Sequence, residues 1–172
     1  MLDRRHVLMG SAALFAFAVQ SNKGEAQTMA ATTIEPATTD FATLSDDDWK
    51  KRLNDQQFYV LRKHGTERPG TSPLNHEKRK GIFACAGCEL PLFSSDTKFE
   101  SGTGWPSFYQ PLAGAVATTT DRSFFMSRTE VHCKRCSGHL GHVFDDGPRP
   151  TGLRYCMNGV ALKFIPVSPG AA

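Results

Sequence analysis

The sequence lacks a concentration of charge of either sign. Its 20 Lys and Arg residues against 17 Asp and Glu residues leave a net charge of only +3. The basic residues are scattered, and acidic residues lie close to them. A nucleic-acid binding surface needs stronger clustering, so no nucleic-acid partner is expected. The composition, 40% hydrophobic and 22% charged, is typical of a soluble protein with one compact domain.

Long apolar runs are also missing. An apolar stretch from Val7 to Val19 follows Arg4, Arg5 and His6 and ends at a polar segment, whereas a membrane-spanning helix needs about 20 apolar residues. This layout is typical of a signal peptide, and the arginine pair resembles a twin-arginine export signal, an ordinary secretory signal being the alternative. We predict a signal peptide over residues 1–26, with cleavage no later than about residue 30. The expected protein is exported, periplasmic and without a stable membrane anchor.

No cysteine directly follows this apolar stretch, so a lipid-attached N-terminus is not expected. Residues 27–44 are rich in Ala and Thr and show no apolar periodicity, which predicts a flexible tether. The folded domain is predicted over residues 45–168. Ser45, followed three residues later by Asp48, predicts a helix that runs to about Asn54, and a second helical stretch is expected to continue through Phe58 to Leu61.

From Gly81 onward, glycines and prolines separate short apolar or aromatic runs, a pattern typical of strands. We therefore predict a mainly β body of short antiparallel strands after the helical lead-in. The predicted strands are Ile82–Ala84, Ser123–Met126, His142–Phe144, Leu153–Tyr155 and Val160–Val167.

Cysteine is scarce, and four of the five cysteines form two copies of one spacing. Cys85-Ala-Gly-Cys88 and Cys133-Lys-Arg-Cys136 can each point two thiolates at one ion, and two such pairs make a tetrahedral zinc site. Because the pairs lie far apart in the sequence, the ion would clamp two distant segments. Four protein ligands leave no position for a catalytic water, so the zinc is expected to be structural. Disulfides and redox-active pairs are the alternatives.

The fifth cysteine, Cys156, lies outside both pairs. It is either a small buried hydrophobe or a nucleophile, and a nucleophile needs help because an ordinary thiol has a pKa of about 8.5. Arg154 falls on the same face of a strand, and His139 and His142 can supply positive charge or a proton, although each histidine alone is more often structural. Trp105 alone would be read as part of the core.

These residues resemble the methionine-R-sulfoxide reductase B family, which reduces the R epimer of methionine sulfoxide. The resemblance covers about Ser45 to Val167 and rests on five ordered motifs. The motifs are Cys85-x-x-Cys88 followed by Pro-Leu-Phe93, Ser101-Gly-Thr-Gly-Trp-Pro-Ser-Phe108, Arg128-Thr-Glu-Val-His-Cys133, His139-Leu-Gly-His-Val-Phe-Asp-Asp-Gly-Pro148 and Arg154-Tyr-Cys156-x-Asn158. It implies two antiparallel β-sheets with short N-terminal helices, stapled by one zinc bound to four cysteines, as in the β-tent (Mss4-like) fold.

The resemblance also implies roles for the candidate site residues. Cys156 matches the nucleophile that attacks the sulfoxide sulfur and becomes a sulfenic acid. His142 and His139 match the pair that binds and protonates the sulfoxide oxygen, which is a poor leaving group until it gains a proton. The remaining matches are Asn158 for orientation, Arg154 for electrostatic support of the thiolate, and Trp105 for packing on the substrate methyl group.

Two positions depart from the family pattern. Gly159 stands where a serine is common, which is expected to loosen local hydrogen bonding. Thr103 stands where many members carry the cysteine that attacks the sulfenic acid. The resemblance therefore implies a one-cysteine cycle, in which an external thiol, either a thioredoxin-like protein or a glutathione-type molecule, reduces Cys156 directly. The expected substrates are oxidised proteins or peptides, in a protein-repair role.

Two other functions compete with this interpretation. A zinc-stapled binding module would use the aromatic residues as a partner surface and need no chemistry at Cys156. A thiol-disulfide oxidoreductase would use the paired cysteines instead of committing them to zinc. We expect a monomeric reductase.

Overall fold

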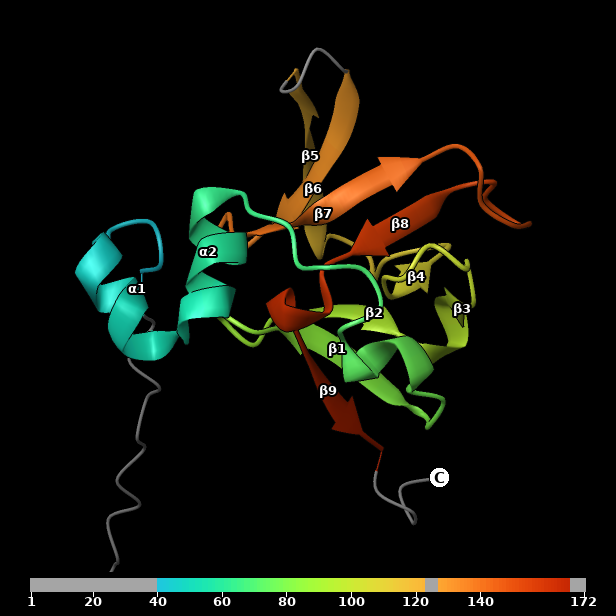
Figure 1. The fold of residues 1–172 in the computed structure, drawn as a ribbon, viewed down its shortest axis with the longest axis horizontal. Coiled ribbons are helices and arrows are strands. Elements are labelled where there is room, and N and C mark those ends of the chain that lie inside the picture. Colours follow the sequence, from blue (N-terminus) through green and yellow to red (C-terminus); the bar gives the residue numbers. More distant parts are fainter. Residues whose placement is uncertain (1–39, 123–126, 168–172) are drawn as a thin grey trace, which may run out of the picture. The chain divides into compact units, whose positions relative to one another are not determined.

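The structure, a computed structural model, describes residues 40–122 and 127–167 (Figure 1). The described residues are mainly β, with two antiparallel sheets and two short N-terminal helices, which confirms the predicted fold class. The predicted signal peptide, residues 27–39 of the predicted tether and the predicted strand Ser123–Met126 lie outside the described residues. No helix in the described ranges is long and apolar enough to cross a membrane.

The two helices are α1 (Asp46–Arg52) and α2 (Asp55–Lys63). Ser45 caps α1 as predicted: its Oγ accepts the N–H of Asp48, and the Asp48 carboxylate accepts the N–H of Ser45. Asn54 and Gln57 form the same reciprocal pair at the start of α2. Such caps satisfy N–H groups that have no partner inside the helix, and each contributes about 1 kcal/mol.

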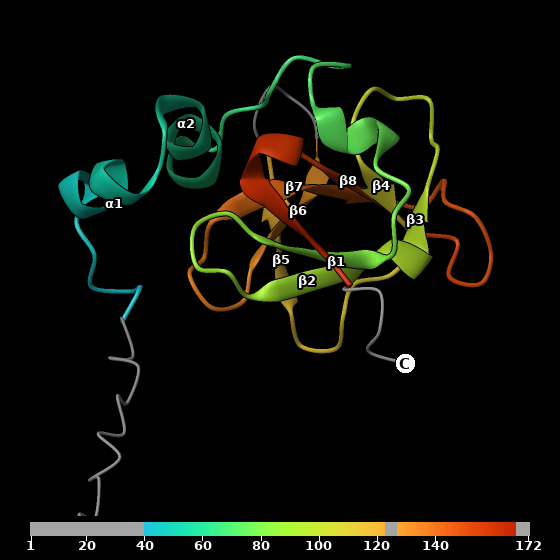
Figure 2. The same cartoon turned by 90° about the horizontal axis from the view of Figure 1, so that it is seen from below.

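The strands form a three-stranded and a six-stranded sheet (Figures 1 and 2). The smaller sheet has the order β2-β1-β9 and the larger has the order β3-β4-β8-β7-β6-β5. Their bounds are β1 (Gly81–Cys85), β2 (Pro91–Ser94), β3 (Lys98–Phe99), β4 (Ser107–Phe108), β5 (Val116–Asp121), β6 (Arg128–Cys133), β7 (His139–Phe144), β8 (Arg154–Met157) and β9 (Leu162–Pro166). Three short 3-10 helices, η1 (Pro73–His76), η2 (Ser95–Thr97) and η4 (Gly159–Ala161), connect them among the described residues.

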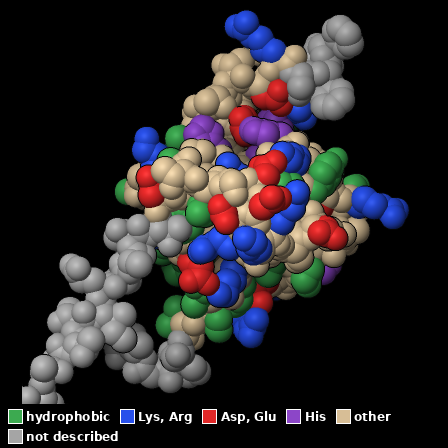
Figure 3. Space-filling model, turned by 90° about the vertical axis from the view of Figure 1, so that its left-hand side faces the viewer, with side chains coloured by type: hydrophobic (Ala, Val, Ile, Leu, Met, Phe, Trp, Pro, Cys, Tyr) green, Lys and Arg blue, Asp and Glu red, His purple; other side chains and the backbone are tan. Residues whose placement is uncertain are grey.

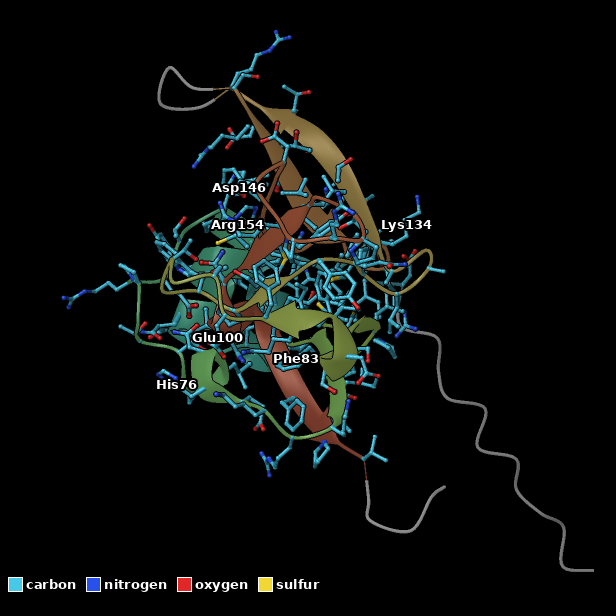
Figure 4. All side chains as sticks on the ribbon, turned by 90° about the vertical axis from the view of Figure 1, so that its right-hand side faces the viewer. His76, Phe83, Glu100, Lys134, Asp146 and Arg154 are labelled. Carbon is cyan, nitrogen blue, oxygen red and sulfur yellow. The ribbon has the colours of Figure 1, made fainter. Side chains whose placement is uncertain are left out.

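Aromatic rings join the two sheets in the core. Phe83 of β1 and Phe93 of β2 both contact Phe108 of β4, with ring centroids 4.9 and 4.4 Å apart, and all three side chains are fully buried. Figure 4 shows Phe83 inside the molecule. Burying each such ring contributes about 1.5–3 kcal/mol. This cluster holds the smaller sheet against the edge of the larger one.

A second aromatic contact extends the domain beyond its predicted start. The ring of Phe41 stacks on the buried Trp49 of α1 at 5.8 Å between centroids. The guanidinium of Arg62 on α2 lies over the same indole at 4.7 Å. The last residues of the predicted tether thus pack on the helices.

The predicted strand Val160–Val167 begins later than expected, because η4 precedes β9 at Leu162. The cause is a side chain from another segment. The Glu67 carboxylate accepts the backbone N–H groups of Gly159 and Val160. Those two N–H groups are therefore turned toward a loop instead of a neighbouring strand.

Candidate active site and metal centre

The four paired cysteines meet in the core between the sheets. All four are buried, and their sulfur atoms lie within 4.8 Å of one another. The Sγ atoms of Cys85 and Cys136 are 3.7 Å apart, and those of Cys88 and Cys133 are 3.5 Å apart. A disulfide requires about 2.05 Å, so these sulfurs are not bonded.

The two cysteine turns have the same backbone geometry. Glu89 follows Cys88 with φ 59°, and Ser137 follows Cys136 with φ 56°. The N–H of Glu89 donates to the Cys85 carbonyl at 2.8 Å, and the N–H of Ser137 donates to the Cys133 carbonyl at 2.9 Å. Each turn ends with a residue in the left-handed region, which costs energy for non-glycine residues and persists only where the surroundings demand it.

The sulfur positions fit a zinc ion. Tetrahedral zinc with Zn–S bonds of about 2.3 Å places neighbouring sulfurs about 3.8 Å apart, close to the two distances above. Cys85 ends β1 of the smaller sheet, and Cys133 ends β6 of the larger. Four close thiols can therefore hold one structural ion that clamps both sheets together.

The fifth cysteine has a different setting. Cys156 lies in the middle of β8, paired with His142 of β7 on one side and with Ser107 of β4 on the other. It is half-buried and faces a pocket that it shares with three other predicted site residues, His142, Trp105 and Asn158. The pocket is lined by Thr66, Trp105, Arg128, Gly141, His142, Phe144, Cys156 and Asn158.

A chain of hydroxyl groups runs from Cys156 into the loop before β4. Thr103 Oγ1 lies 3.8 Å from Cys156 Sγ, Ser101 Oγ lies 2.8 Å from Thr103 Oγ1, and Ser107 Oγ lies 2.7 Å from Ser101 Oγ. Burial raises the pKa of Cys156 above its ordinary value, although the Thr103 hydroxyl and the Arg154 charge oppose the rise. At rest Cys156 is therefore a thiol, with groups in place that stabilise its thiolate.

The two histidines occupy different depths. His142 lines the pocket, and its Nε2 lies 2.9 Å from Asp121 Oδ2. His139 does not line the pocket: it is buried behind His142, with ring centroids 5.4 Å apart. Its Nδ1 lies 2.7 Å from Glu130 Oε1, and its Nε2 has no hydrogen-bond partner among the described residues. On the face shown in Figure 3, histidine side chains gather beside acidic ones.

These environments separate the roles of the two rings. Burial lowers the pKa of His139, although the neighbouring Glu130 opposes the shift. The predicted pair is thus a pocket histidine, His142, backed by a buried and predominantly neutral one. Asp121, which also pairs with Arg128 at 2.7 Å, holds His142 in place; the sequence reasoning assigned it no role.

Arg154 lies two residues before Cys156 on β8, and its charge lowers the pKa of the Cys156 thiol. Its guanidinium forms two hydrogen bonds of 2.8 Å with Asp146 (Figure 4) and lies over the ring of Phe144 at 4.4 Å. The ion pair with Asp146 and the nearby Cys156 thiolate raise the pKa of Arg154 further, against burial. A bidentate pair fixes the planar guanidinium, so its charge stays beside Cys156.

Glu67 is the residue that sequence reasoning missed. Its N–H donates to Asn158 Oδ1 at 2.9 Å, its carbonyl accepts the indole N–H of Trp105 at 3.2 Å, and its carboxylate accepts two N–H groups after Asn158. One residue thus positions both Asn158 and Trp105 at the pocket. Burial raises the Glu67 pKa, and the two N–H donors oppose this shift. Its place directly before Arg68 in a loop offered no sequence signal.

Gly159 is required by packing. A Cβ at this position would lie 1.9 Å from the hydroxyl oxygen of Ser72 and 3.3 Å from Glu67 Oε1. The predicted loosening by Gly159 is therefore offset, because the buried side chain of Ser72 occupies the space. Gly141 meets a similar limit, since its Cβ would lie 2.1 Å from the carbonyl oxygen of Cys156; glycine lets β7 approach β8 at the nucleophile.

Comparison with known proteins finds a matching domain family and several similar proteins. The SelR domain family matches residues 53–166. The peptide methionine sulfoxide reductase MsrB of Agrobacterium fabrum is 54% identical over 124 residues, which cover 72% of this chain and 92% of that protein. The MsrB of Leptospira interrogans is 58% identical over 121 residues (70% and 92%), and the chloroplastic peptide methionine sulfoxide reductase B1 of Arabidopsis thaliana is 56% identical over 125 residues (72% and 62%).

Proposed function

Because the chain belongs to the SelR domain family, that of the B-type methionine-R-sulfoxide reductases, we propose that it reduces peptide-bound methionine (R)-sulfoxide through a sulfenic acid on Cys156. The chain is an oxidoreductase that acts on methionine sulfoxide, and its family uses thiol reductants in general. The finer steps below are our proposal for its own residues.

One observation carries the proposal: Cys156, His142, Trp105 and Asn158 line a single pocket. A methyl sulfoxide needs an apolar surface for the methyl group and a donor for the oxygen. Trp105 supplies the first, through a sulfur-aromatic contact of up to about 1.5 kcal/mol. His142 of β7 and Asn158, directly after β8, supply hydrogen-bond donors.

In the first step, the Cys156 sulfur attacks the sulfoxide sulfur and the sulfur-oxygen bond of the substrate breaks. The attack forms a sulfur-sulfur bond to the substrate, and the protonated oxygen leaves as water. Water then attacks the Cys156 sulfur and breaks the sulfur-sulfur bond, which releases the thioether and leaves a sulfenic acid on Cys156. His142 donates a proton to the departing oxygen while Asp121 holds its other side. The proton balance is closed by the proton that Cys156 loses.

In the second step, an external thiol attacks the sulfenic acid, releases water and leaves a mixed disulfide, which a second thiol reduces to restore Cys156. Thr103 contacts Cys156 but has no sulfur. The other four cysteines are buried in the metal centre, away from the pocket. A one-cysteine cycle fits this arrangement.

The activity is tested with a peptide that carries either the R or the S sulfoxide, dithiothreitol as reductant, and a Cys156→Ser variant. We expect turnover of the R form only, and loss of at least about a thousandfold in the variant with the fold and the metal content retained. Activity on the S form alone would overturn the assignment.

The one-cysteine cycle is tested by oxidising the enzyme with one equivalent of substrate without reductant. A dimedone-type probe should label Cys156, whereas a Thr103→Cys variant should instead lose two hydrogens by mass and resist the probe. This variant is a matched control because the Thr103 and Cys156 side chains are already in contact at 3.8 Å. Loss of two hydrogens in the unchanged protein would contradict the cycle.

We further propose that the four-thiol centre holds zinc and that the chain is exported to the periplasm as a monomer, to act on oxidised proteins there. Zinc is supported by the donor set and the sulfur spacing. Export is supported by Arg4, Arg5 and the apolar stretch after them. Metal analysis should find one zinc per chain, and replacing both arginines with lysine should retain the protein in the cytoplasm if the twin-arginine route is used.

A further inference from the structure

The pocket at Cys156 shares a lining residue with a larger groove. Thr66 lines both the pocket and a groove between α2, the loop after it and η4. The groove measures about 580 Å³ and the pocket about 140 Å³. The pocket thus has room for one side chain, while the groove has room for several residues of a chain that continues past it.

We propose that this groove binds the polypeptide residues that flank the oxidised methionine, a proposal that rests on the proposed function. The position of Thr66, which lines both the pocket and the groove, carries the argument. A peptide whose oxidised side chain enters the pocket must place its neighbours on the surface at the rim, and the groove is the larger concave surface there.

The groove offers an aromatic platform at one end. Tyr59 of α2 is 56% exposed and, with Ile165 and Val167, belongs to the large hydrophobic side chains exposed in the described ranges. Its ring lies over Gly65, where an added Cβ would come within 2.2 Å of it. An exposed tyrosine has only two side-chain torsions to order on binding, which makes it suited to contact with a peptide.

A cation lies in the loop that forms the other wall. Arg68 is exposed, and its guanidinium forms no ion pair or side-chain hydrogen bond within the part of the chain that is described. The nearby Glu67 carboxylate is occupied by two backbone N–H groups. Free positive charge in the groove predicts a preference for an acidic residue near the oxidised methionine.

A second groove adjoins the pocket across Trp105 and provides the matched control. Its lining includes His76, Lys98 and Glu100. Lys98 is already committed, since its ammonium donates to the Asn75 carbonyl at 2.8 Å and lies 3.4 Å from Glu100. The charges that line this second groove are therefore largely compensated by other groups of the protein.

The test measures single turnover of fully reduced enzyme, with no electron donor present. The substrates are N-acetyl-methionine (R)-sulfoxide methylamide and two otherwise identical heptapeptides that carry Asp or Lys beside the sulfoxide. The variants are Tyr59→Ala, Tyr59→Phe and Arg68→Glu, with His76→Ala and Glu100→Gln for the other groove. Omitting the donor separates substrate binding from donor docking.

We expect Tyr59→Ala to lower the second-order rate constant for both peptides about tenfold and to leave the small amide unchanged, with Tyr59→Phe restoring the rate. Arg68→Glu should reverse the preference from the Asp peptide to the Lys peptide. The control variants should leave all three rates as they were.

Equal losses on the amide and the peptides, or no loss on either, would overturn the proposal. So would a peptide effect confined to the His76 and Glu100 variants, or effects that appear only in steady state with a protein donor. Failure of the unchanged enzyme to reduce the small amide would instead refute the proposed function, so the two failures are distinct.

Discussion

The metal centre and the pocket use the same side chain in opposite ways. The four paired cysteines are 0–5% exposed, come from two matching turns and lie within contact distance of one another. Cys156 lies mid-strand, half-buried, beside a hydroxyl, a cation and a histidine. A closed coordination shell would keep the four paired thiols unreactive, whereas partial exposure beside a positive charge is the setting of a reactive thiol.

The two regions also differ in how their positions are maintained. The four thiols of the candidate metal centre can hold one shared ion, so each ligand would depend on the other three. The pocket depends on separate supports: Asp121 for His142, Asp146 for Arg154, and Glu67 for Asn158 and Trp105. A substitution in the metal centre should therefore unfold the whole domain. A substitution at one support of the pocket should lower activity only in part.

The largest expected effect comes from removing one of the four thiols that join the two sheets. Cys133→Ser should unfold the domain, because structural zinc contributes on the order of 10 kcal/mol to such sites, comparable with the stability of a whole domain. Circular dichroism and zinc content are the measurements. A folded, active Cys133→Ser protein would erase the contrast between the two regions.

The next largest effect is expected from a substitution at Gly159, where an added Cβ would overlap Ser72. Gly159→Ser should destabilise the protein by about 1–3 kcal/mol and lower activity, because the new side chain collides with Ser72 and disturbs the Glu67 carboxylate. Thermal unfolding and kcat/KM are the measurements. The double variant Ser72→Gly with Gly159→Ser should recover most of both losses, and equal damage in the single and double variants would show that the two side chains do not compete.

A smaller effect concerns pH. Burial raises the Cys156 pKa, so the thiolate is the minor form at neutral pH and its fraction grows as pH rises toward that pKa. Alkylation of Cys156 by iodoacetamide should therefore accelerate about tenfold per unit between pH 7 and 8.5. Intact mass counts the labels, with Cys156→Ser as the blank. A rate that is flat across this range would mean that the thiolate is already the main form.

The smallest expected effect comes from the Thr103 hydroxyl. Thr103→Val removes a group that lowers the Cys156 pKa, so alkylation at pH 7.5 should slow about two- to threefold. Thr103→Ser keeps the hydroxyl and should react at the original rate. Identical rates in all three proteins would remove Thr103 from the electrostatics of the nucleophile.

Short-range sequence patterns predicted many of the helices and strands of this fold. The cap at Ser45, the two helices and the strands that begin near Ile82 and His142 follow from short-range signals that the structure repeats. The two pairs of cysteines predicted a four-thiol centre, because two intervening residues let both thiols of a turn point at one ion. Strands such as β4 and β5 were missed, since two residues or a run of threonines carry little apolar alternation.

Short-range sequence patterns could not predict the residues that hold the pocket side chains in place. Glu67 reaches Asn158 from far along the chain, and Asp121 reaches His142 from a different strand. Neither contact has a spacing that a sequence displays. For the same reason the two histidines, equal as motif residues, could not be separated into one at the pocket and one buried beside Glu130.

The contact between Ser72 and Gly159 also constrains how this sequence can change over time. Serines at both positions crowd each other, because a Cβ at position 159 would overlap the hydroxyl oxygen of Ser72. A lineage that moves the serine from position 72 to position 159 avoids this loss of stability by passing through glycine at both. A descendant that takes the steps in reverse order would first carry the less stable and less active protein with both serines.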